Sequence, residues 1–506
     1  MIRKLIDAIF HRQTVTWPER HFMPIVIAGV VLTMAISLAI GLNQSVWFDE
    51  AYSIMLAKQS TAELLHLTAI DTHPPLYYLL LQGWAAIFGW SEVALRSLSV
   101  LAMGGAALVG TLLVKKLFGV RVALIALPFI VFAPFLLRYG FEIRMYALAS
   151  FIGVAATYTL VSALQARDKQ RQWKLYALYA LLVAIGVYTL YYTVLLWLAH
   201  LAWLVWTAKK DKQPILRAPW FVALGGSVAF FLPWLPTFIS QVGNGALAAI
   251  SQPLTIDNLI GIVSFMFVYQ PTWQLTALMS LVIVFVITAL IVLSIRAWKN
   301  ADKKQHSYLL LLALYILGPI AILTLVSLVK PMYVERYLSH VMIAGSMLVG
   351  VVVALALAKK PTKRIIAMSI GLFAVMLIGV VQLANVGNYN FQRLQIPAVK
   401  EIASSIKDCG KDTTVFAADP YTAIELAYYL PDCEIRFYSE TLELKGGYAP
   451  LSNNTLHVAN PESELANSKK LVYVYYDEQK LKMPATLTEV SNLSIGPLQA
   501  ATFSAE

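Results

Sequence analysis

The chain has 506 residues, of which 59% are hydrophobic and only 13% are charged, and this composition excludes an ordinary soluble globular protein. Its net charge of +11 at pH 7 does not indicate nucleic-acid binding, because the basic residues form short patches between apolar segments. Such patches are typical of the cytoplasmic loops of membrane proteins. The apolar segments are about 18 to 23 residues long, enough to cross the hydrocarbon core as helices. The sequence therefore predicts an all-α polytopic membrane protein with no nucleic-acid partner.

Hydropathy and the distribution of charge together predict eleven membrane-spanning helices. In chain order they are 23–42, 92–114, 121–137, 145–165, 175–190, 193–207, 219–239, 274–295, 307–329, 338–358 and 365–384. The basic segment 1–20 places the N-terminus in the cytoplasm, and the odd number of spans places the C-terminal tail on the other side. On this topology the cytoplasmic side receives about four times as many Lys and Arg residues as the outer loops. We therefore expect a multi-pass protein of the cell (plasma) membrane.

The first outer loop, 43–91, contains an apolar segment, 74–89, that could be taken for a further span. It is short, begins with two prolines and is rich in Tyr and Trp, as interfacial helices are. If it crossed the membrane, every later basic patch would lie outside, against the positive-inside rule. We expect it to lie in the membrane interface. The segment 257–271 is predicted to be a re-entrant or interfacial element on the same outer side.

The composition changes after about residue 384. The tail, 385–506, is more polar, with strand-like runs at 413–417 and 470–476, a predicted helix at 397–407 and helical spacing at 421–430. These features predict a small extracytoplasmic α/β domain that follows a transmembrane domain, 1–384.

Both cysteines of the chain, Cys409 and Cys433, lie in this tail. An oxidising compartment would permit a disulfide between them, and two free buried thiols are the alternative.

Ionisable residues collect in the outer loops, where they are candidates for chemistry. Asp49 and Glu50 are adjacent carboxylates just after the first span, although they could merely cap a helix that starts at residue 51. Asp71 and His73 precede two prolines and could instead form only a turn.

Arginines near the outer ends of later spans are candidate anion-binding residues. Arg138 and Arg144 lie on either side of Glu142, where they could bind a phosphate or act as snorkelling anchors. Arg336 follows Glu335 and could form only a local ion pair with it. The sequence has no glycine-rich nucleotide loop, Walker lysine motif, paired-cysteine metal motif or nucleophile elbow, so we expect a membrane-borne donor rather than a nucleotide.

Several motifs resemble those of the integral-membrane glycosyltransferases of the GT-C superfamily, above all the group related to protein O-mannosyltransferases and lipid A aminoarabinose transferases. The similarity covers roughly residues 20 to 200, with the motifs WFDEAYS at 47–53, THPPLYYLLLQGWAAIFGWSEVALRSLSVL at 72–101, KKLFG at 115–119 and RYGFEIRMYAL at 138–148. The later spans match only in general character and in ERYL at 335–338.

The resemblance implies transfer of a sugar, with inversion, from a polyprenyl-phosphate-linked donor to an acceptor lipid, glycan or protein at the outer face of the membrane. It implies that Asp49 acts as base or as metal-site carboxylate with Glu50 beside it, and that His73, Arg138, Arg144 and Arg336 bind substrate. It leaves open a divalent cation, Mg or Mn, at Asp49. The alternative is a transporter or flippase of a lipid-linked sugar. Transporters place ionisable groups near the midplane and carry inverted repeats, whereas here these groups gather at one face.

Overall fold

The computed structural model describes residues 17–212, 214–215, 218–243, 254–269, 276–386, 398–406, 409, 413–440 and 457–505. The first 16 residues of the predicted cytoplasmic N-terminus, and residues 397 and 407 of the predicted helix 397–407, lie outside this part of the chain. The chain divides into two compact units. Unit 1 comprises residues 1–40, 96–240 and 250–385, and unit 2 comprises 41–95, 241–249 and 386–506.

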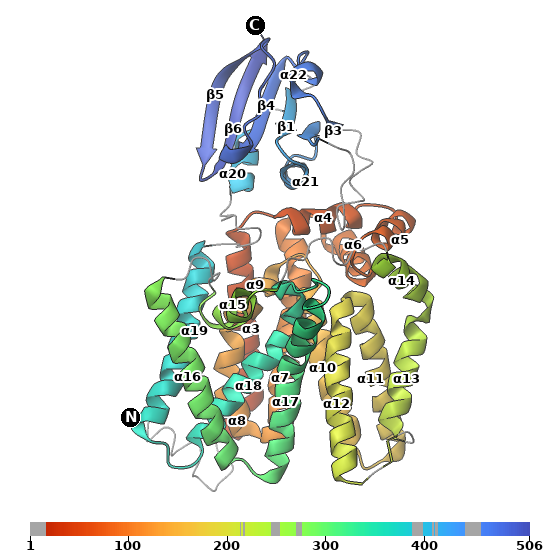
Figure 1. Cartoon of the computed structure of the whole chain (residues 1–506), viewed down its shortest axis with the longest axis vertical. Coiled ribbons are helices and arrows are strands. Elements are labelled where there is room, and N and C mark those ends of the chain that lie inside the picture. Colours follow the sequence, from red (N-terminus) through yellow and green to blue (C-terminus); the bar gives the residue numbers. More distant parts are fainter. Residues whose placement is uncertain are drawn as a thin grey trace. The chain divides into compact units, whose positions relative to one another are not determined.

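Unit 1 is a bundle of helices (Figure 1). Its elements are α2 (Trp17–Arg20), α3 (Phe22–Leu42), α7 (Glu92–Phe118), α8 (Val120–Val131), α9 (Pro134–Phe141), α10 (Tyr146–Gln165), α11 (Lys169–Thr189), η1 (Tyr191–Thr193), α12 (Val194–Lys210), α13 (Pro219–Phe231), η2 (Leu232–Trp234), α14 (Leu235–Gly243), α15 (Ile256–Phe267), α16 (Ala277–Asn300), α17 (Lys303–Ser327), η5 (Glu335–Leu338), α18 (Ser339–Leu357) and α19 (Lys363–Val386). The last residues of α3 and α14 and the first of α7 belong to unit 2.

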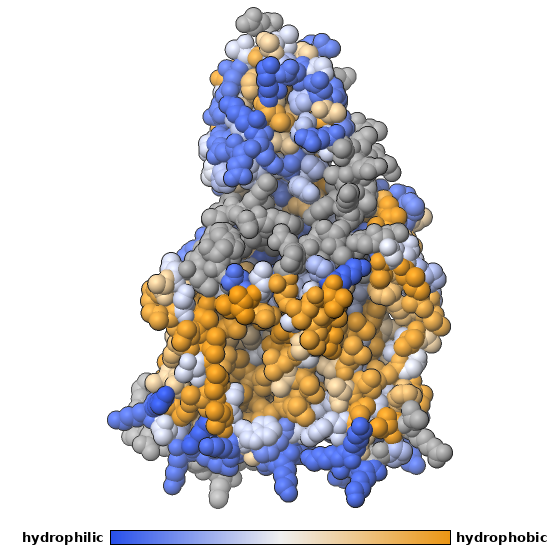
Figure 2. All heavy atoms as spheres, viewed as in Figure 1, coloured by the Kyte–Doolittle hydropathy of each residue, from blue (hydrophilic) through white to orange (hydrophobic). Residues whose placement is uncertain are grey.

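In the described part of the chain, nine helices are long and apolar enough to cross a membrane, or ten if the bent pair α8 and α9 counts as one span. Hydrophobic residues cover the sides of the bundle, and hydrophilic residues gather at the end where α12 joins α13 and α16 joins α17 (Figure 2). The chain is therefore a multi-pass membrane protein. One predicted span, 175–190, is not among these helices. Its residues 175–189 lie in α11, but polar residues of that helix such as Gln172 and Lys174 lower its mean hydropathy.

One predicted span is broken. The stretch 121–137 was expected to form a single helix, but α8 ends at Val131 and α9 starts at Pro134, with a bend of 61°. Pro134 has no N–H to continue the helical hydrogen bonds of α8, and a proline is well suited to the first position of a new helix. The break makes α9 a short, separate helix near the end of the bundle.

The centre of unit 1 is α18, in which almost every residue is buried and which packs against α8, α10, α16 and α17. Small residues allow this close packing. A Cβ atom placed on Gly350 would lie 2.5 Å from the Cα atom of Ala126 in α8. The helices therefore meet backbone to backbone at this point.

Unit 2 combines the first loop with the C-terminal α/β region. The loop forms α4 (Phe48–Ala57), α5 (Thr61–Ile70) and α6 (Leu76–Phe88), and the C-terminal region forms α20 (Ala398–Ser405), β1 (Thr413–Ala417), α21 (Pro420–Tyr429), β2 (Ile435–Tyr438), β3 (His457–Val458), α22 (Pro461–Glu464), β4 (Lys470–Tyr476), η8 (Asp477–Gln479), β5 (Leu487–Ile495) and β6 (Leu498–Ala505). The predicted strands at 413–417 and 470–476 match β1 and β4 exactly in extent. The segment 74–89 forms a helix of 13 residues, shorter than a span.

The six strands form one sheet in the order β3-β2-β1-β4-β6-β5. The first four are parallel, and β6 and β5 continue the sheet antiparallel. Alternate side chains fill two cores: Val415 and Val472 belong to the one that includes residues of α20 and α21, and Phe416 and Tyr473 belong to the one on the opposite face. Both cores agree with a small α/β domain.

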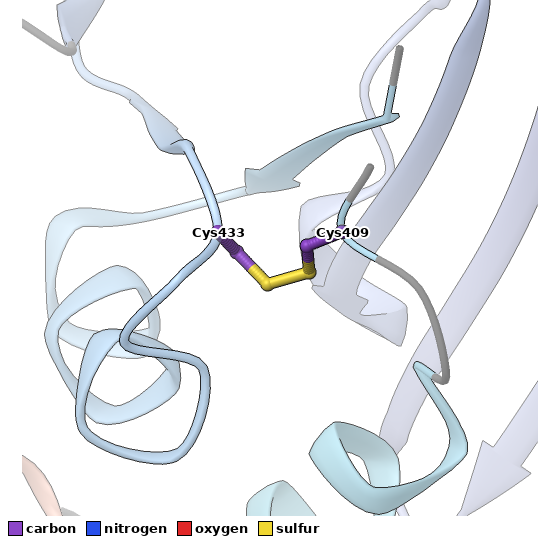
Figure 3. Close-up of a disulfide and its surroundings, with 2 residues drawn as sticks. All are labelled: Cys409 and Cys433. Atoms are coloured by element: carbon purple, nitrogen blue, oxygen red, sulfur yellow. A yellow bond between two sulfur atoms is a disulfide. The ribbon is translucent and has the colours of Figure 1, made fainter. Parts of the chain in front are cut away.

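Cys409 and Cys433 form a disulfide, with their Cα atoms 5.1 Å apart (Figure 3). Of the two alternatives that the sequence left open, the structure has the bonded one. It ties the segment before β1 to the turn between α21 and β2.

Candidate active site

Asp49 and Glu50 lie in the first turn of α4, and both are buried although both are acids. A carboxylate is favoured at a helix N-terminus, where the backbone N–H groups carry partial positive charge. Glu50 Oε2 accepts a hydrogen bond from the N–H of Trp47, at 3.3 Å, so Glu50 helps to start the helix. The C=O of Asp49 accepts a hydrogen bond from Ser53 Oγ, at 2.8 Å. The acids do not cap a helix that starts at residue 51, because α4 starts at Phe48 with Trp47 as its N-cap; Glu50 supports that cap from the first turn.

His73 lies in a second buried polar group of unit 2, between α5 and α6. Its Nδ1 atom is 3.6 Å from Asp71 Oδ2 and 2.8 Å from Thr72 Oγ1, which also donates to Asp71 Oδ1 at 3.3 Å. Gln241 Nε2 donates to the C=O groups of Thr68 and Asp71, which fixes the end of α5. The turn that the two prolines predict is present, and it holds His73 beside a carboxylate.

In unit 1, α9 and the turn after it form a third group, which is rich in arginine. Arg138 Nη1 and Glu142 Oε2 form an ion pair at 3.1 Å, and both side chains are almost completely buried. Arg144 is buried as well, and its C=O accepts a hydrogen bond from Ser99 Oγ at 3.4 Å. The broken span positions this group, because Arg138 lies on the short helix that Pro134 starts.

Arg96 was only one of many outer-loop ionisable residues in the sequence, yet it is fully buried in α7. Its guanidinium lies 5.7 Å from the ring centroid of Phe141, and that of Arg138 lies 5.0 Å from the same centroid. Two buried arginines thus share one aromatic ring, a favourable arrangement for cations. The sequence signal was an arginine in the first turns of an apolar span, where a cation is costly unless it has a role.

Arg336 lies in the short helix η5, half-buried, with its guanidinium 5.7 Å from the Tyr337 ring centroid. The neighbouring Glu335 accepts a hydrogen bond from Asn258 Nδ2 of α15, at 3.1 Å. Of the element expected at 257–271, residues 257–267 lie in helix α15, which contacts η5, and residues 270–271 lie outside the described part of the chain.

The structure thus places Asp49, Glu50 and His73 in unit 2, and Arg138, Arg144 and Arg336 in unit 1. Within the described ranges, no group of three or more His, Cys, Asp or Glu residues could hold a metal ion. Carboxylates and an imidazole can accept or donate protons, and buried guanidiniums can bind a phosphate.

A protein family and several solved structures are similar to this chain. Residues 72–237 match the family described as dolichyl-phosphate-mannose-protein mannosyltransferase. A comparison with curated protein sequences finds no match. The chain has an ArnT-like fold, and the family match over residues 72–237 together with this fold indicates a membrane glycosyltransferase.

Among solved structures, the chain is similar to ArnT from Cupriavidus metallidurans, both in the apo state and bound to undecaprenyl phosphate. Each comparison has 12% sequence identity and a TM-score of 0.59, and covers 94% of this chain and 97% of the ArnT chain. The oligosaccharyltransferase of Archaeoglobus fulgidus in the apo form is also similar, at 13% identity and a TM-score of 0.48, over 90% of this chain and 70% of that one.

Proposed function

We propose that this chain transfers a sugar from a polyprenyl-phosphate-linked donor to an acceptor at the outer face of the membrane, with inversion. The donor class is supported by the fold shared with ArnT, which has been crystallised with undecaprenyl phosphate. The side is supported by the connections α12–α13 and α16–α17 at one end of the bundle, whose sequences are basic and which the positive-inside rule assigns to the cytoplasm. The N-terminus would then be cytoplasmic and the C-terminal domain, 385–506, extracytoplasmic.

The observation that carries the proposal is Asp49, a buried carboxylate in the first turn of α4. In the reaction, a lone pair of the acceptor oxygen attacks the anomeric carbon while the bond from that carbon to the phosphate oxygen breaks. The bonding electrons leave with the phosphate, and the acceptor proton passes to Asp49.

The remaining residues have supporting roles in this proposal. Arg138, Arg144 and Arg336 would bind the donor phosphate and stabilise the negative charge that develops on it, and His73 would bind substrate in its position beside Asp71. Glu50 would hold the start of α4 through Trp47. The described acids do not form a ligand set for a metal, so no step of this mechanism passes through a divalent cation.

The experiment compares Asp49→Asn with Glu50→Gln and with Glu63→Gln, an exposed acid in the first turn of α5. Purified full-length protein is given a polyprenyl-phosphate sugar and an acceptor, and the released polyprenyl phosphate is quantified. Asp49→Asn should lower turnover by about 10² to 10⁴, because that is the usual contribution of a positioned base. Glu63→Gln should be active.

Glu50→Gln distinguishes a cap from a second base. Loss of the cap alone costs stability, about 1 kcal/mol, and leaves much of the turnover. Near-normal release by Asp49→Asn, in protein that is folded and inserted, would refute the assignment. If the purified protein moves the intact donor across the membrane of vesicles and releases no polyprenyl phosphate, it is a transporter or flippase instead.

A further inference from the structure

A cavity of about 270 Å³ lies within unit 2, between α4, α21 and the start of β2. Its walls are mostly apolar: α4 contributes Ala51, Ile54 and Met55, and α21 contributes Ile424 and Ala427. Strand β2 contributes Ile435 and Phe437. The cavity is large enough for part of a small molecule and not for a whole one.

The polar side chains of the cavity belong to Lys58 and Tyr428. Lys58 is exposed at the C-terminal end of α4, and its Nζ atom lies 5.6 Å from the ring centroid of Trp90. Tyr428 Oη donates a hydrogen bond to the C=O of Trp90 at 3.2 Å. Lys58 and Ala427 both line the cavity and both are exposed, so the mouth of the cavity carries an ammonium group with the ring of Trp90 beside it.

Helix α6, which contacts α4, has an exposed apolar end. Gln82 of α6 donates hydrogen bonds to the C=O groups of Ala57 and Gln59, which holds α6 against this end of α4. At the end of α6, Ile87 is 76% exposed and Phe88 is 55% exposed. In a protein that crosses a membrane, such an exposed apolar helix end is suited to contact with lipid.

The cavity is not on the side of α4 that carries Asp49. Ile54 and Met55 are centred about five and a half residues after Asp49, which at 100° per residue is a rotation of roughly 170°. A molecule in the cavity would therefore touch the back of the helix that bears the proposed base.

We infer that this cavity binds an anionic amphiphile from the membrane surface, with its chain between α4 and α21 and its anion on Lys58. An apolar cavity with a single cation at its mouth fits a ligand with one chain and one charge. Such a ligand would hold α4 against α21 and steady Asp49 without reacting itself. The disulfide supports the same wall, because Cys433 lines the cavity.

The probe is decyl phosphate that carries a diazirine at the end of its chain. It is photolysed with the full-length protein in phosphatidylcholine nanodiscs, and the labelled peptides are mapped by mass spectrometry. We expect labels on the peptides that contain Met55 and Ile424. Decyl phosphate should compete, whereas decyl glucoside, which has the chain without the charge, and inorganic phosphate, which has the charge without the chain, should not.

Two variants with matched controls test the two ends of the site. Lys58→Gln should lower labelling about three- to tenfold, as expected for a partly exposed charge contact, and Lys480→Gln, at another exposed lysine of unit 2, should not. Ala427→Trp fills the mouth and should abolish labelling, while Ala62→Trp, at an exposed position of α5, should leave it intact. Thermal unfolding checks that all four variants are folded.

Equal labelling of Ala427→Trp, or no labelling of these peptides in the unmodified protein, would overturn the inference. Equal competition by decyl glucoside would remove the selectivity for an anion, and equal competition by inorganic phosphate would remove the membrane ligand. The inference does not depend on turnover. Labels on the peptides of Arg138 or Arg336 would report the proposed donor site instead, so the two proposals fail separately.

Discussion

The hydroxyl of Tyr429 links the C-terminal α/β region to the first loop within unit 2, and its removal should have a large effect. Tyr429 Oη donates a hydrogen bond to Glu92 Oε1, at 2.8 Å, and accepts one from the N–H of Val46, at 2.7 Å. The other oxygen of Glu92 pairs with Lys400 Nζ, at 3.1 Å. Val46 directly precedes Trp47, the N-cap residue of α4, so this network reaches the start of the helix that carries Asp49.

The size of the effect follows from burial. The Glu92 side chain is only 11% exposed, and a hydrogen bond to a carboxylate in such a place contributes about 1.5–3 kcal/mol. Tyr429→Phe also leaves the N–H of the buried Val46 without its acceptor, a cost of about 1–3 kcal/mol that water partly offsets. We expect a loss of about 2–4 kcal/mol in the free energy of unfolding. Lys400→Ala should cost less than about 1 kcal/mol, because the lysine is 41% exposed.

The assay is thermal unfolding of the full-length protein, followed by tryptophan fluorescence. For a unit of this size, about 2–4 °C per kcal/mol gives a fall of about 4–16 °C in the Tm of unit 2 for Tyr429→Phe. The matched control is Tyr428→Phe, which removes a single, more exposed hydrogen bond to Trp90 and should shift the Tm by no more than about 3 °C. Equal shifts in Tm for the two tyrosine variants would refute the reasoning, because the hydrogen bond to the Glu92 carboxylate would then contribute no more to stability than the exposed one to Trp90.

Two further substitutions test packing and pH dependence. Gly350→Ala should destabilise unit 1 by about 1–3 kcal/mol, since the new Cβ meets the backbone of Ala126. Gly225→Ala has open space around it and should be neutral or stabilising. The two variants are compared by Tm and by yield in the membrane, and equal values would contradict the packing argument. Burial raises the pKa of the Tyr473 hydroxyl above its ordinary value, so the folded state favours the neutral phenol. The stability that the neutral phenol contributes is complete below about pH 10 and is lost as the pH rises further. Tyr473→Phe, which loses the hydrogen bond from the Leu481 N–H, should lower the Tm by about 3–6 °C at pH 8 and by clearly less at pH 11; a constant difference would show that ionisation has no part in it.

The sequence predicted the regular elements where one physical signal dominates. The β-branched and aromatic runs at 413–417 and 470–476 match β1 and β4, since both strands lie in the middle of the sheet and are buried. Strand β5, Leu487–Ile495, was not predicted, because it is an edge strand with mostly exposed polar side chains and a bulge between Glu489 and Ser491. Edge strands of this kind lack the apolar pattern on which such predictions depend.

The roles of the candidate site residues stay predictions, and the sequence predicted the local geometry around them only in part. Hydropathy runs without interruption across 121–137, so it could not reveal the bend at Pro134 that separates Arg138 from α8. The burial of Arg96 is a tertiary property, set by packing against Phe141, and local sequence contains no measure of it. The capping alternative placed the helix start at residue 51, whereas α4 starts at Phe48 with Trp47 as its N-cap; Glu50 supports this start from inside the first turn.

Three of the buried ionisable groups are held by partners from their own stretch of chain. Glu50 accepts from Trp47, His73 lies against Thr72, and Arg138 pairs with Glu142 one turn later. Groups fixed in this way do not have to reorient when charge develops in a reaction, and this is the condition under which electrostatic stabilisation contributes most to catalysis. Burial of such groups costs stability, so the bent span and the capped helix are better explained by the proposed transfer reaction than by the needs of the fold. On this argument, a substitution that preserves charge and moves its position, such as Asp49→Glu, should impair transfer nearly as much as Asp49→Asn while leaving the fold intact.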